Sequence, residues 1–302
     1  MPKNITPEMV AINKKICKRR NQGQLSPMRE ACRRLVRNRT AIIGMAIVLF
    51  MLLVALLAPL IAPQDYAEMD LDNILQGPSL QHLFGTDDAG RDLFSRCIYG
   101  TRITLPIAFF STLVAVVVGG TVGVVSAYFG GSADTIIMRI IDIWGSIPGM
   151  MLSVAVVACF GNNIAVLVIG LSIGAIPNMA RMFRGSIFTV VDNDYVESSR
   201  SIGAGNNRIM FLHLLPNSVG PVILAIVNLL SSQVLGVSTL SFIGVGVNPP
   251  TPEWGALLSS GKSFLSTYPH LCAFPGLCIV LCVLGFNLLG DGLRDALDPR
   301  LK

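Results

Sequence analysis

Long stretches of uncharged apolar residues recur along most of this chain, and they restrict the folds that it can adopt. A bilayer with a hydrocarbon core about 30 Å thick requires roughly 20 apolar residues for each helix that crosses it. Six stretches meet this requirement, and they lie near Ala41–Ala62, Ile103–Phe129, Thr135–Phe160, Ile164–Arg184, Pro216–Val247 and Leu271–Gly290. Only 14% of the 302 residues are charged, against about 25% in soluble domains. The pattern predicts an all-α membrane protein with six transmembrane helices.

Basic residues beside the six stretches predict which side of the membrane each loop occupies. Nineteen of the 23 lysine and arginine residues lie in the N-terminal forty residues, at the start of the third stretch, after the fourth stretch or near the C-terminus. The other four lie in segments 64–102 and 248–270, and segment 64–102 is rich in acidic residues. Because short loops rich in lysine and arginine stay in the cytoplasm, both termini are predicted to be cytoplasmic and these two segments external.

The first forty residues form a basic segment that precedes the first apolar stretch. Ser26 followed by Pro27 is typical of a helix start, and the apolar residues behind it would share one face. We expect residues 1–40 to be a cytoplasmic arm with an interfacial helix, although an irregular basic tail fits residues 1–25 nearly as well. The first apolar stretch exceeds the roughly 7–15 residues of a secretory signal core. Residues 41–302 are therefore expected to form one membrane domain that retains its first span.

Ionisable residues at bilayer depth mark ion paths, proton relays and intramembrane catalysis, and they are nearly absent from the six stretches. Arg139 and Asp142 lie three apart near the predicted cytoplasmic end of the third stretch, where they can pair or be hydrated. The seven cysteines show no disulfide or zinc pattern. Gly255–Ser263 looks like a phosphate-binding loop but has one residue too many between its glycines. We expect no catalytic residue, cofactor or metal site, so any energy source lies outside this chain.

Three other clusters indicate structure rather than ligand binding. Gly85 and Gly90 bracket two acidic residues, which predicts a turn network in the external loop. Trp254 follows three closely spaced prolines and is expected at the membrane interface, where tryptophan is enriched. The charged residues after Gly290 are expected to form a hydrated cap.

The internal loop between the fourth and fifth stretches, residues 185–215, has the pattern of two short helices that meet at a glycine. Asp194 can cap a helix that reaches about Ile202, and Gly203 can adopt the positive φ that ends it. A second helix would run from about Asn206 into the fifth span. Such an element projects from the membrane without crossing it, which suits docking into a cleft on a cytosolic partner. An ordinary amphipathic connector is the alternative.

This loop resembles the coupling loop of ABC importer permeases. The family pattern is Glu-Ala-Ala, three residues, Gly, nine residues and then an apolar stretch that ends in Pro. Glu197, Gly203 and Pro216 match it at the correct spacing. Ser198 and Ser199 replace the two alanines, which keeps the residues small.

Three more blocks of sequence narrow the resemblance. They are His82–Arg96, Leu240–Gly255 and Phe286–Arg300, and all three are similar to the C-type permease subunit of dipeptide and oligopeptide importers. Four ordered blocks, counting the loop, cover the chain from about residue 35 to its end.

The resemblance implies a type I ABC importer permease fold in a bacterial or archaeal plasma membrane. It implies that the chain assembles with a homologous second permease, two cytosolic ATPase subunits and an extracytoplasmic solute-binding protein. ATP and Mg would bind to the ATPase subunits, and no nucleic acid partner is expected. The resemblance assigns ATPase coupling to Tyr195, Glu197, Ser198, Ser199, Ile202, Gly203, Ala204, Arg208 and Pro216.

The implied function is to form half of a translocation path for di- or oligopeptides as a non-catalytic subunit. The alternative is a permease of the same architecture that imports nickel, glutathione or an opine. Few residues distinguish the two, because the binding protein largely selects the solute in such systems. An intramembrane enzyme would require paired acids, a serine–lysine pair or a metal set at bilayer depth, and the apolar stretches offer none. A scaffold or passive channel would show no dependence on an ATPase.

Overall fold

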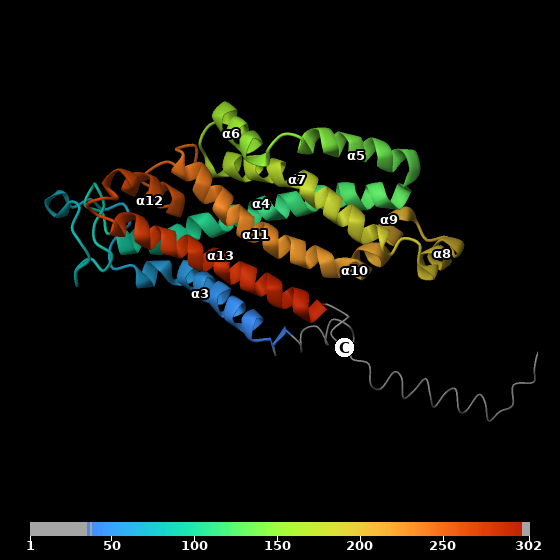
Figure 1. The fold of residues 1–302 in the computed structure, drawn as a ribbon, viewed down its shortest axis with the longest axis horizontal. Coiled ribbons are helices and arrows are strands. Elements are labelled where there is room, and N and C mark those ends of the chain that lie inside the picture. The colour runs from blue at the N-terminus through green and yellow to red at the C-terminus, as the bar shows by residue number, and fades with distance from the viewer. Residues whose placement is uncertain (1–34, 37, 298–302) are drawn as a thin grey trace, which may run out of the picture.

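A computed structural model shows a bundle of long helices with irregular loops and a short helix at one end (Figure 1). The structure describes residues 35, 36 and 38–297. The arm expected at residues 1–40, with its interfacial helix, therefore lies almost entirely outside the described residues. Within the described part of the chain, the only β-structure is an isolated bridge between Thr86 and Asp92. The expected all-α class is confirmed.

Five helices in the described part of the chain are long and apolar enough to cross a bilayer. They are α3 (Arg39–Ile61), α4 (Leu93–Phe129), α7 (Ile164–Phe188), α11 (Val219–Phe242) and α13 (His270–Leu297). Each corresponds to one of the predicted spans. α4 begins ten residues before the expected Ile103, because the Asp92 side chain caps it by accepting a hydrogen bond from the Ser95 amide. Residues 93–102 are therefore helical rather than part of a loop.

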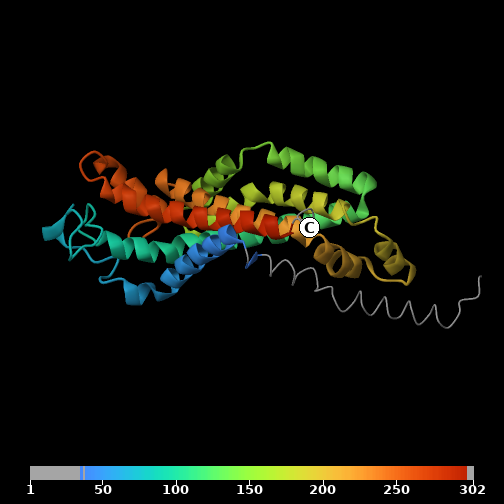
Figure 2. The same ribbon diagram turned by 60° about the horizontal axis from the view of Figure 1, so that its bottom comes forward.

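The third span is broken, although the sequence predicts one helix over Thr135–Phe160. The structure instead has α5 (Gly131–Gly145) and α6 (Gly149–Phe160), whose axes differ by 73°. Pro148 at the break has no N–H to continue the helix, and its ring disfavours helical conformation at Ile147. Figure 2 shows this pair on the outside of the bundle, next to α7. The pair counts as a sixth span only if both halves cross together.

Small residues let these helices approach closely. A Cβ atom on Gly174 of α7 would lie only 2.8 Å from the carbonyl oxygen of Gly149 in α6, and one on Gly123 of α4 only 2.3 Å from that of Ala180. The Ser153 hydroxyl donates a hydrogen bond of 2.9 Å to the Gly170 carbonyl. Because lipid tails are as apolar as leucine, such close contacts and hydrogen bonds hold membrane helices together.

Paired charges hold the loop that precedes α4, as the turn-network prediction expects. Arg91 Nε donates to Asp87 Oδ2 at 2.8 Å, and His82 Nδ1 lies 3.1 Å from Asp92 Oδ1. Gly90 adopts a φ of +74°, and a Cβ there would collide with the Asp70 carbonyl. The loop also contains the short 3-10 helix η1 (Leu71–Asn73).

Trp254 begins α12 (Trp254–Gly261), which is followed by the 3-10 helix η3 (Lys262–Phe264). The side chain of Trp254 is fully buried, which confirms the structural role expected for it, and its depth relative to a membrane interface stays a prediction. Its indole N–H donates to the Cys97 carbonyl at 3.0 Å, and the ring fills the space left by a glycine on α4. Glu253 beside it is also fully buried, and it accepts a hydrogen bond of 3.0 Å from the Thr104 hydroxyl.

Two ion pairs join α5 to α7 at the other end of the bundle. Arg184 contacts both carboxylate oxygens of Asp134 at 2.5 Å. Arg181 lies 3.4 Å from Asp142, so Asp142 pairs with α7 rather than with Arg139 of its own helix. Neither pair is evident in the sequence, because the partners lie far apart in it.

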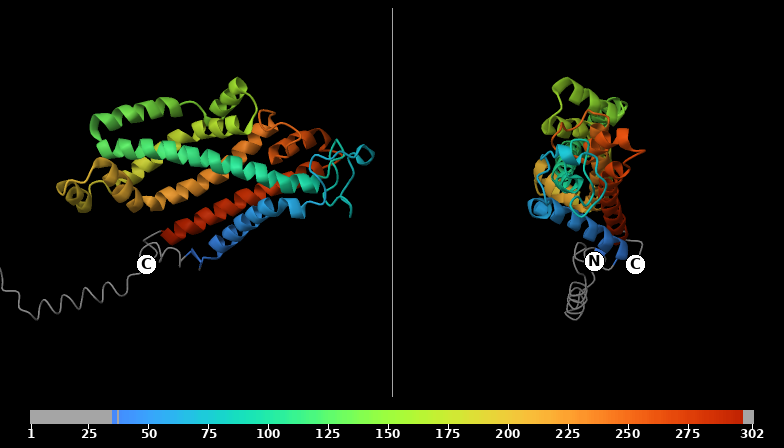
Figure 3. Two further views of the ribbon diagram at one scale, coloured as in Figure 1. Left: turned by 180° about the vertical axis from the view of Figure 1, so that it is seen from behind. Right: turned by 90° about the vertical axis from the view of Figure 1, so that its left-hand side faces the viewer.

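The two ends of the bundle differ in how tightly the helices are gathered. Figure 3 shows α3 and α13 running side by side and diverging from α4 toward the end that carries the α7–α11 connection. At the opposite end the same helices converge beneath the loops and α12. The α7–α11 connection therefore lies far from these loops.

The close approach of α6 and α7 yields a prediction about stability. Gly174→Ala should lower the unfolding free energy by about 1–3 kcal/mol, because the added methyl group would meet backbone on the facing helix. Gly185→Ala adds the same group to the same helix in open space and should leave stability unchanged or raise it slightly. Thermal unfolding of the purified chain in detergent measures both, and equal midpoints would show that the crossing is not tightly packed.

Candidate functional site

The segment between α7 and α11 folds into short helices, the first of which, α8, lies at the far end of the bundle (Figure 1). They are α8 (Asp194–Ser201), α9 (Asn206–Arg208), η2 (Ile209–Leu214) and α10 (Leu215–Asn217). The first of the two expected helices is confirmed. The second does not run unbroken into α11, because η2 is a π-helix and Ser218 separates α10 from α11. Pro216 cannot donate a backbone hydrogen bond, which interrupts the regular pattern at this point.

We call α8, the turn at Gly203 and α9 (residues 194–208) the tip. The two ends of α8 set its shape. Asn193, rather than the expected Asp194, is the residue before the helix, and its side chain makes no capping bond. At the other end Gly203 adopts a φ of +81°, as expected. The Gly203 amide donates to the Arg200 carbonyl at 2.9 Å, and the Ala204 amide donates to the Ser199 carbonyl at 3.1 Å. These two bonds form a Schellman motif, which needs a left-handed residue at this position.

One face of the segment is anchored in the hydrophobic core. Val196 of α8 and Ile209 and Leu214 of η2 are buried in one cluster with Phe183 and Ile187 of α7. Burying side chains of this size stabilises a structure by about 1.5–3 kcal/mol each. The base of the tip is therefore part of the bundle rather than a loose loop.

The last turn of α4 clamps both sides of the turn at Gly203. The Tyr128 hydroxyl donates a hydrogen bond of 2.8 Å to Asn206 Oδ1 at the start of α9. The Arg200 guanidinium of α8 lies over the Tyr128 ring, 5.0 Å from its centroid, which is within cation–π distance. Tyr128 therefore connects the end of α4 to both α8 and α9.

The nine residues assigned to this loop fall into three groups. Glu197, Ser198, Ile202, Gly203 and Arg208 are exposed at the tip. Tyr195, Ser199 and Ala204 are half-buried against its base. Pro216 is exposed but lies in α10, behind the tip and beside the start of α11.

Ile202 is the most prominent apolar side chain of the tip, with 85% of its surface exposed. Beside α8 lies an open hollow of about 520 Å³ whose lining is mainly polar. It is lined by Val191, Asp192, Asn193, Val196, Glu197, Arg200 and Ser201. The exposed Ile202 side chain and the polar hollow beside α8 together form a surface on which another protein can dock.

Sequence reasoning missed the residues that hold the tip in place. Tyr128 and Asn206 are 78 positions apart, and Arg200 looks like any solvated charge in the sequence. No local pattern signals such a contact, because it depends on how α4 and the loop meet in three dimensions.

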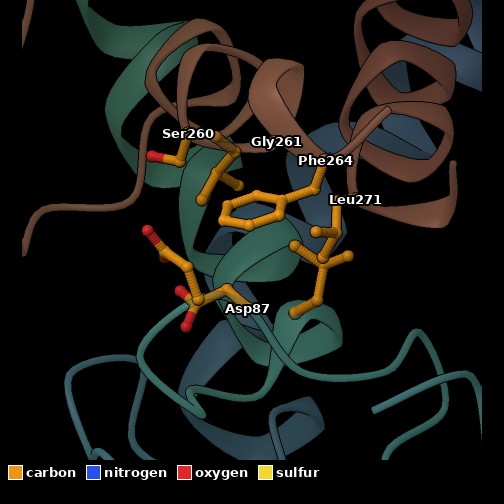
Figure 4. Close-up of a pocket in the computed structure, with 8 residues that line it drawn as sticks. Asp87, Ser260, Gly261, Phe264 and Leu271 are labelled. Carbon is orange, nitrogen blue, oxygen red and sulfur yellow. The ribbon is translucent and has the colours of Figure 1, made fainter. Parts of the chain in front are cut away.

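A second cluster of polar residues, at the opposite end, is a packing contact. Asp87 and Asp88 face a pocket between their loop and α12 (Figure 4), which is also lined by Leu93, Leu257, Ser260, Gly261, Phe264 and Leu271. Its volume is only about 10 Å³, which is at most enough for one water molecule. Asp87 is engaged by Arg91 at 2.8 Å and by Arg96 at 3.4 Å. The pocket therefore holds no solute.

The remaining candidates also lack the geometry of a ligand site. The apparent phosphate-binding motif at Gly255–Ser263 is helical over α12 and η3, and a Cβ on Gly255 would meet the Ser238 carbonyl at 2.0 Å. Among the residues that the structure describes, no group of three or more His, Cys, Asp or Glu side chains could hold a metal ion.

Comparison with known proteins relates this architecture to a family. Residues 115–302 match the family described as the inner membrane component of binding-protein-dependent transport systems. The chain belongs to this family. Residues 26–78 also match the N-terminal transmembrane domain of oligopeptide transport permease C. The chain is thus a multi-pass permease subunit of the bacterial inner membrane.

Curated relatives are similar to this permease over nearly their whole length. The dipeptide transport system permease protein DppC of Alkalihalophilus pseudofirmus is 40% identical over 278 residues, which cover 92% of this chain and 91% of the relative. The glutathione transport system permease protein GsiD of Pectobacterium atrosepticum is 42% identical over 284 residues, or 94% of each chain.

Solved ABC transporters share the fold of the permease. An inward-facing form of the MetNI methionine ABC transporter superposes with a TM-score of 0.56 at 22% identity, covering 68% of this chain and 98% of the other. An amino acid ABC transporter crystallised with histidines gives a TM-score of 0.52 at 17% identity, covering 67% and 94%. At this level of identity the likeness concerns the fold alone.

Proposed function

We propose that this permease forms half of the translocation path of an ATP-driven importer for di- or oligopeptides. A homologous second permease supplies the other half, and a solute-binding protein delivers the peptide from outside. Two cytosolic ATPase subunits bind ATP and Mg and drive the cycle, while this chain catalyses no reaction. The α8 tip docks on one of the ATPase subunits.

The architecture of the tip is the observation that supports this proposal most strongly. Its base is buried beside α7 and clamped by Tyr128 of α4, whereas Glu197 and Ile202 point into solvent. An ordinary connector would have no need to fix an exposed apolar side chain beyond the bundle. A docking element needs its exposed side chain to be fixed, because a partner that moves the element must also move α4 and α7 behind it.

Charge supports the orientation in which the tip and both termini are cytoplasmic. Arg200 and Arg208 of the tip are exposed, and the ends of α7 and α13 add further arginines. At the opposite end Arg91 and Arg96 are buried against Asp87, and Arg102 and Lys262 are the exposed basic residues among those that the structure describes there. The excess of free basic residues marks the cytoplasmic side.

Peptides are the solute class favoured by the relatives. One relative is named as a dipeptide permease and another as a glutathione permease, and glutathione is itself a short peptide. A glutathione importer is therefore the second candidate.

Gly203 offers a direct test of the coupling role. Gly203→Val should disrupt the Schellman motif, since a left-handed conformation costs a β-branched residue at least about 1–2 kcal/mol, a factor of about 5–30 in the population of correctly shaped tips. We expect solute-stimulated ATPase activity and uptake by the assembled importer in proteoliposomes to fall by a similar factor, with membrane insertion unchanged.

Gly205 provides the matched control for this experiment. It is exposed and has a φ of −67° and a ψ of 151°, which valine adopts readily. Gly205→Val should therefore retain most of the uptake. Normal uptake by Gly203→Val would contradict the docking role of the tip.

Competition for uptake distinguishes the candidate solutes. In cells that express the importer with its binding protein, an excess of unlabelled dipeptide should reduce uptake of a labelled dipeptide, while nickel ions should not. If only glutathione competes, the second candidate is correct, and if only nickel competes, the peptide proposal fails.

A further inference from the structure

A large apolar groove lies on the outside of the bundle between α3 and α4, with α11 and α13 at its floor. Its volume is about 730 Å³, and nearly all of its lining is apolar. The lining residues are Val48, Leu52, Ala55, Leu56, Arg102, Leu105, Pro106, Ala108, Phe109, Phe110, Leu230 and Phe286. Arg102 is the one charged side chain among them, and neither the coupling loop nor the loops at the other end contribute to the groove.

Arg102 is an unusual residue for this position. It is exposed on α4, inside a helix that is long and apolar enough to span the bilayer. No acidic side chain of the described residues lies within ion-pair distance of it. A cation at bilayer depth is costly unless it reaches the interface or meets an anion. The groove therefore offers an unmatched positive charge.

The depth of Arg102 follows from the way α3 meets α4. The Gln64 amide just after α3 donates a hydrogen bond of 3.3 Å to the Ser95 hydroxyl, so the end of α3 lies level with Ser95. Arg102 is seven residues further along α4, which places its Cα about 10 Å deeper. A flexible arginine side chain can extend back from that depth toward the headgroup region.

The length of the groove matches one leaflet of a bilayer. Its lining spans Val48–Leu56 on α3 and Arg102–Phe110 on α4, about 12 Å along each helix. Half of a hydrocarbon core is about 15 Å thick. The groove thus runs from the level that Arg102 can reach toward the middle of the bilayer, parallel to an acyl chain.

The chemistry of the lining favours an acyl chain over a peptide. Apart from Arg102, the groove residues are aliphatic, aromatic or proline, so their side chains supply no hydrogen-bonding group. A peptide placed there would bury amide groups without partners, which is unfavourable. An acyl chain buries only methylene groups, and a phosphate satisfies the arginine.

We propose that this groove binds an anionic phospholipid from the leaflet on the α12 side, with its phosphate at Arg102 and an acyl chain along α3 and α4. The site depends on neither the identity of the solute nor the docking of the tip. It would fasten α3 to α4 where these helices begin to diverge (Figure 3).

A photo-crosslinking amino acid at Leu105 tests this site within the assembled importer. The complex is reconstituted into nanodiscs that contain phosphatidylcholine and phosphatidylglycerol in equal amounts, then irradiated, and mass spectrometry identifies what is attached to position 105. We expect phosphatidylglycerol to be the main adduct. The same probe at Leu52, on the α3 side of the groove, should give the same product. This second position controls for the possibility that the probe at Leu105 itself distorts the groove.

Substitutions in the groove should change the yield of this adduct in a defined order. Arg102→Gln should reduce it about fivefold, since a basic residue near a membrane surface attracts an anionic lipid by roughly that factor, whereas Arg102→Lys should retain most of it. Ala55→Trp keeps the charge but fills the groove and should reduce the yield as well. Arg139→Gln removes an exposed arginine of α5 and should have no effect.

Three results would overturn the proposal. The first is an adduct yield that is unchanged in Arg102→Gln. The second is attachment of both probes to the partner permease, which would show that a helix of that subunit fills the groove. The third is displacement of the lipid adduct by the transported solute, which would make the groove part of the translocation path.

Discussion

The absence of water from the bilayer core is the constraint on which this structure depends. Backbone amides and carbonyls in hydrocarbon must form hydrogen bonds with each other, and an α-helix satisfies this requirement within a single segment. Regular helices therefore fill the middle of the molecule, and most irregular backbone is collected at its two ends. The bundle is held by close contacts, such as Gly174 against Gly149, because burial of apolar surface gains little in lipid.

α4 connects the two ends of the molecule. Its 37 residues extend about 55 Å, from the capped turn at Asp92 to Tyr128 beside the projecting tip. The first turn belongs to a buried network of charges, and the last contacts both α8 and α9. In the proposed function, this helix would carry a displacement of the tip toward the other end of the bundle.

The long helices could be predicted from the sequence because membrane thickness requires an apolar run of nearly fixed length. The turn at Gly203 could also be predicted, since glycine is the residue that a left-handed helix end favours. The predictions failed where local sequence and tertiary contact disagreed. Pro148 lies inside an apolar run but breaks the third span, and residues 93–102 were expected in a loop but belong to α4, because Asp92 caps the helix.

The contacts that join α5 to α7 and those that position the projecting tip could not be predicted, since they connect distant segments. Asp134 and Arg184 are 50 positions apart, and Tyr128 meets Asn206 only because α4 ends beside α9. The family resemblance assigned a role to nine residues of this loop, exposed and half-buried alike, whereas the structure adds Tyr128 and Asn206, which hold the tip in place. A coupling element requires both sets, because an exposed surface that is free to move cannot transmit force.

Cross-linking of Ile202→Cys in the assembled importer would show whether the tip docks on an ATPase subunit. With 85% of its side chain exposed at the tip, position 202 should react with a cysteine placed along the receiving groove of an ATPase subunit, under mild oxidation. Leu80 is 99% exposed at the opposite end, and Leu80→Cys should give no such product. A cross-link from position 80 to the ATPase subunit would contradict docking of the tip. The absence of any cross-link from cysteines placed along the tip of an intact complex would contradict it as well.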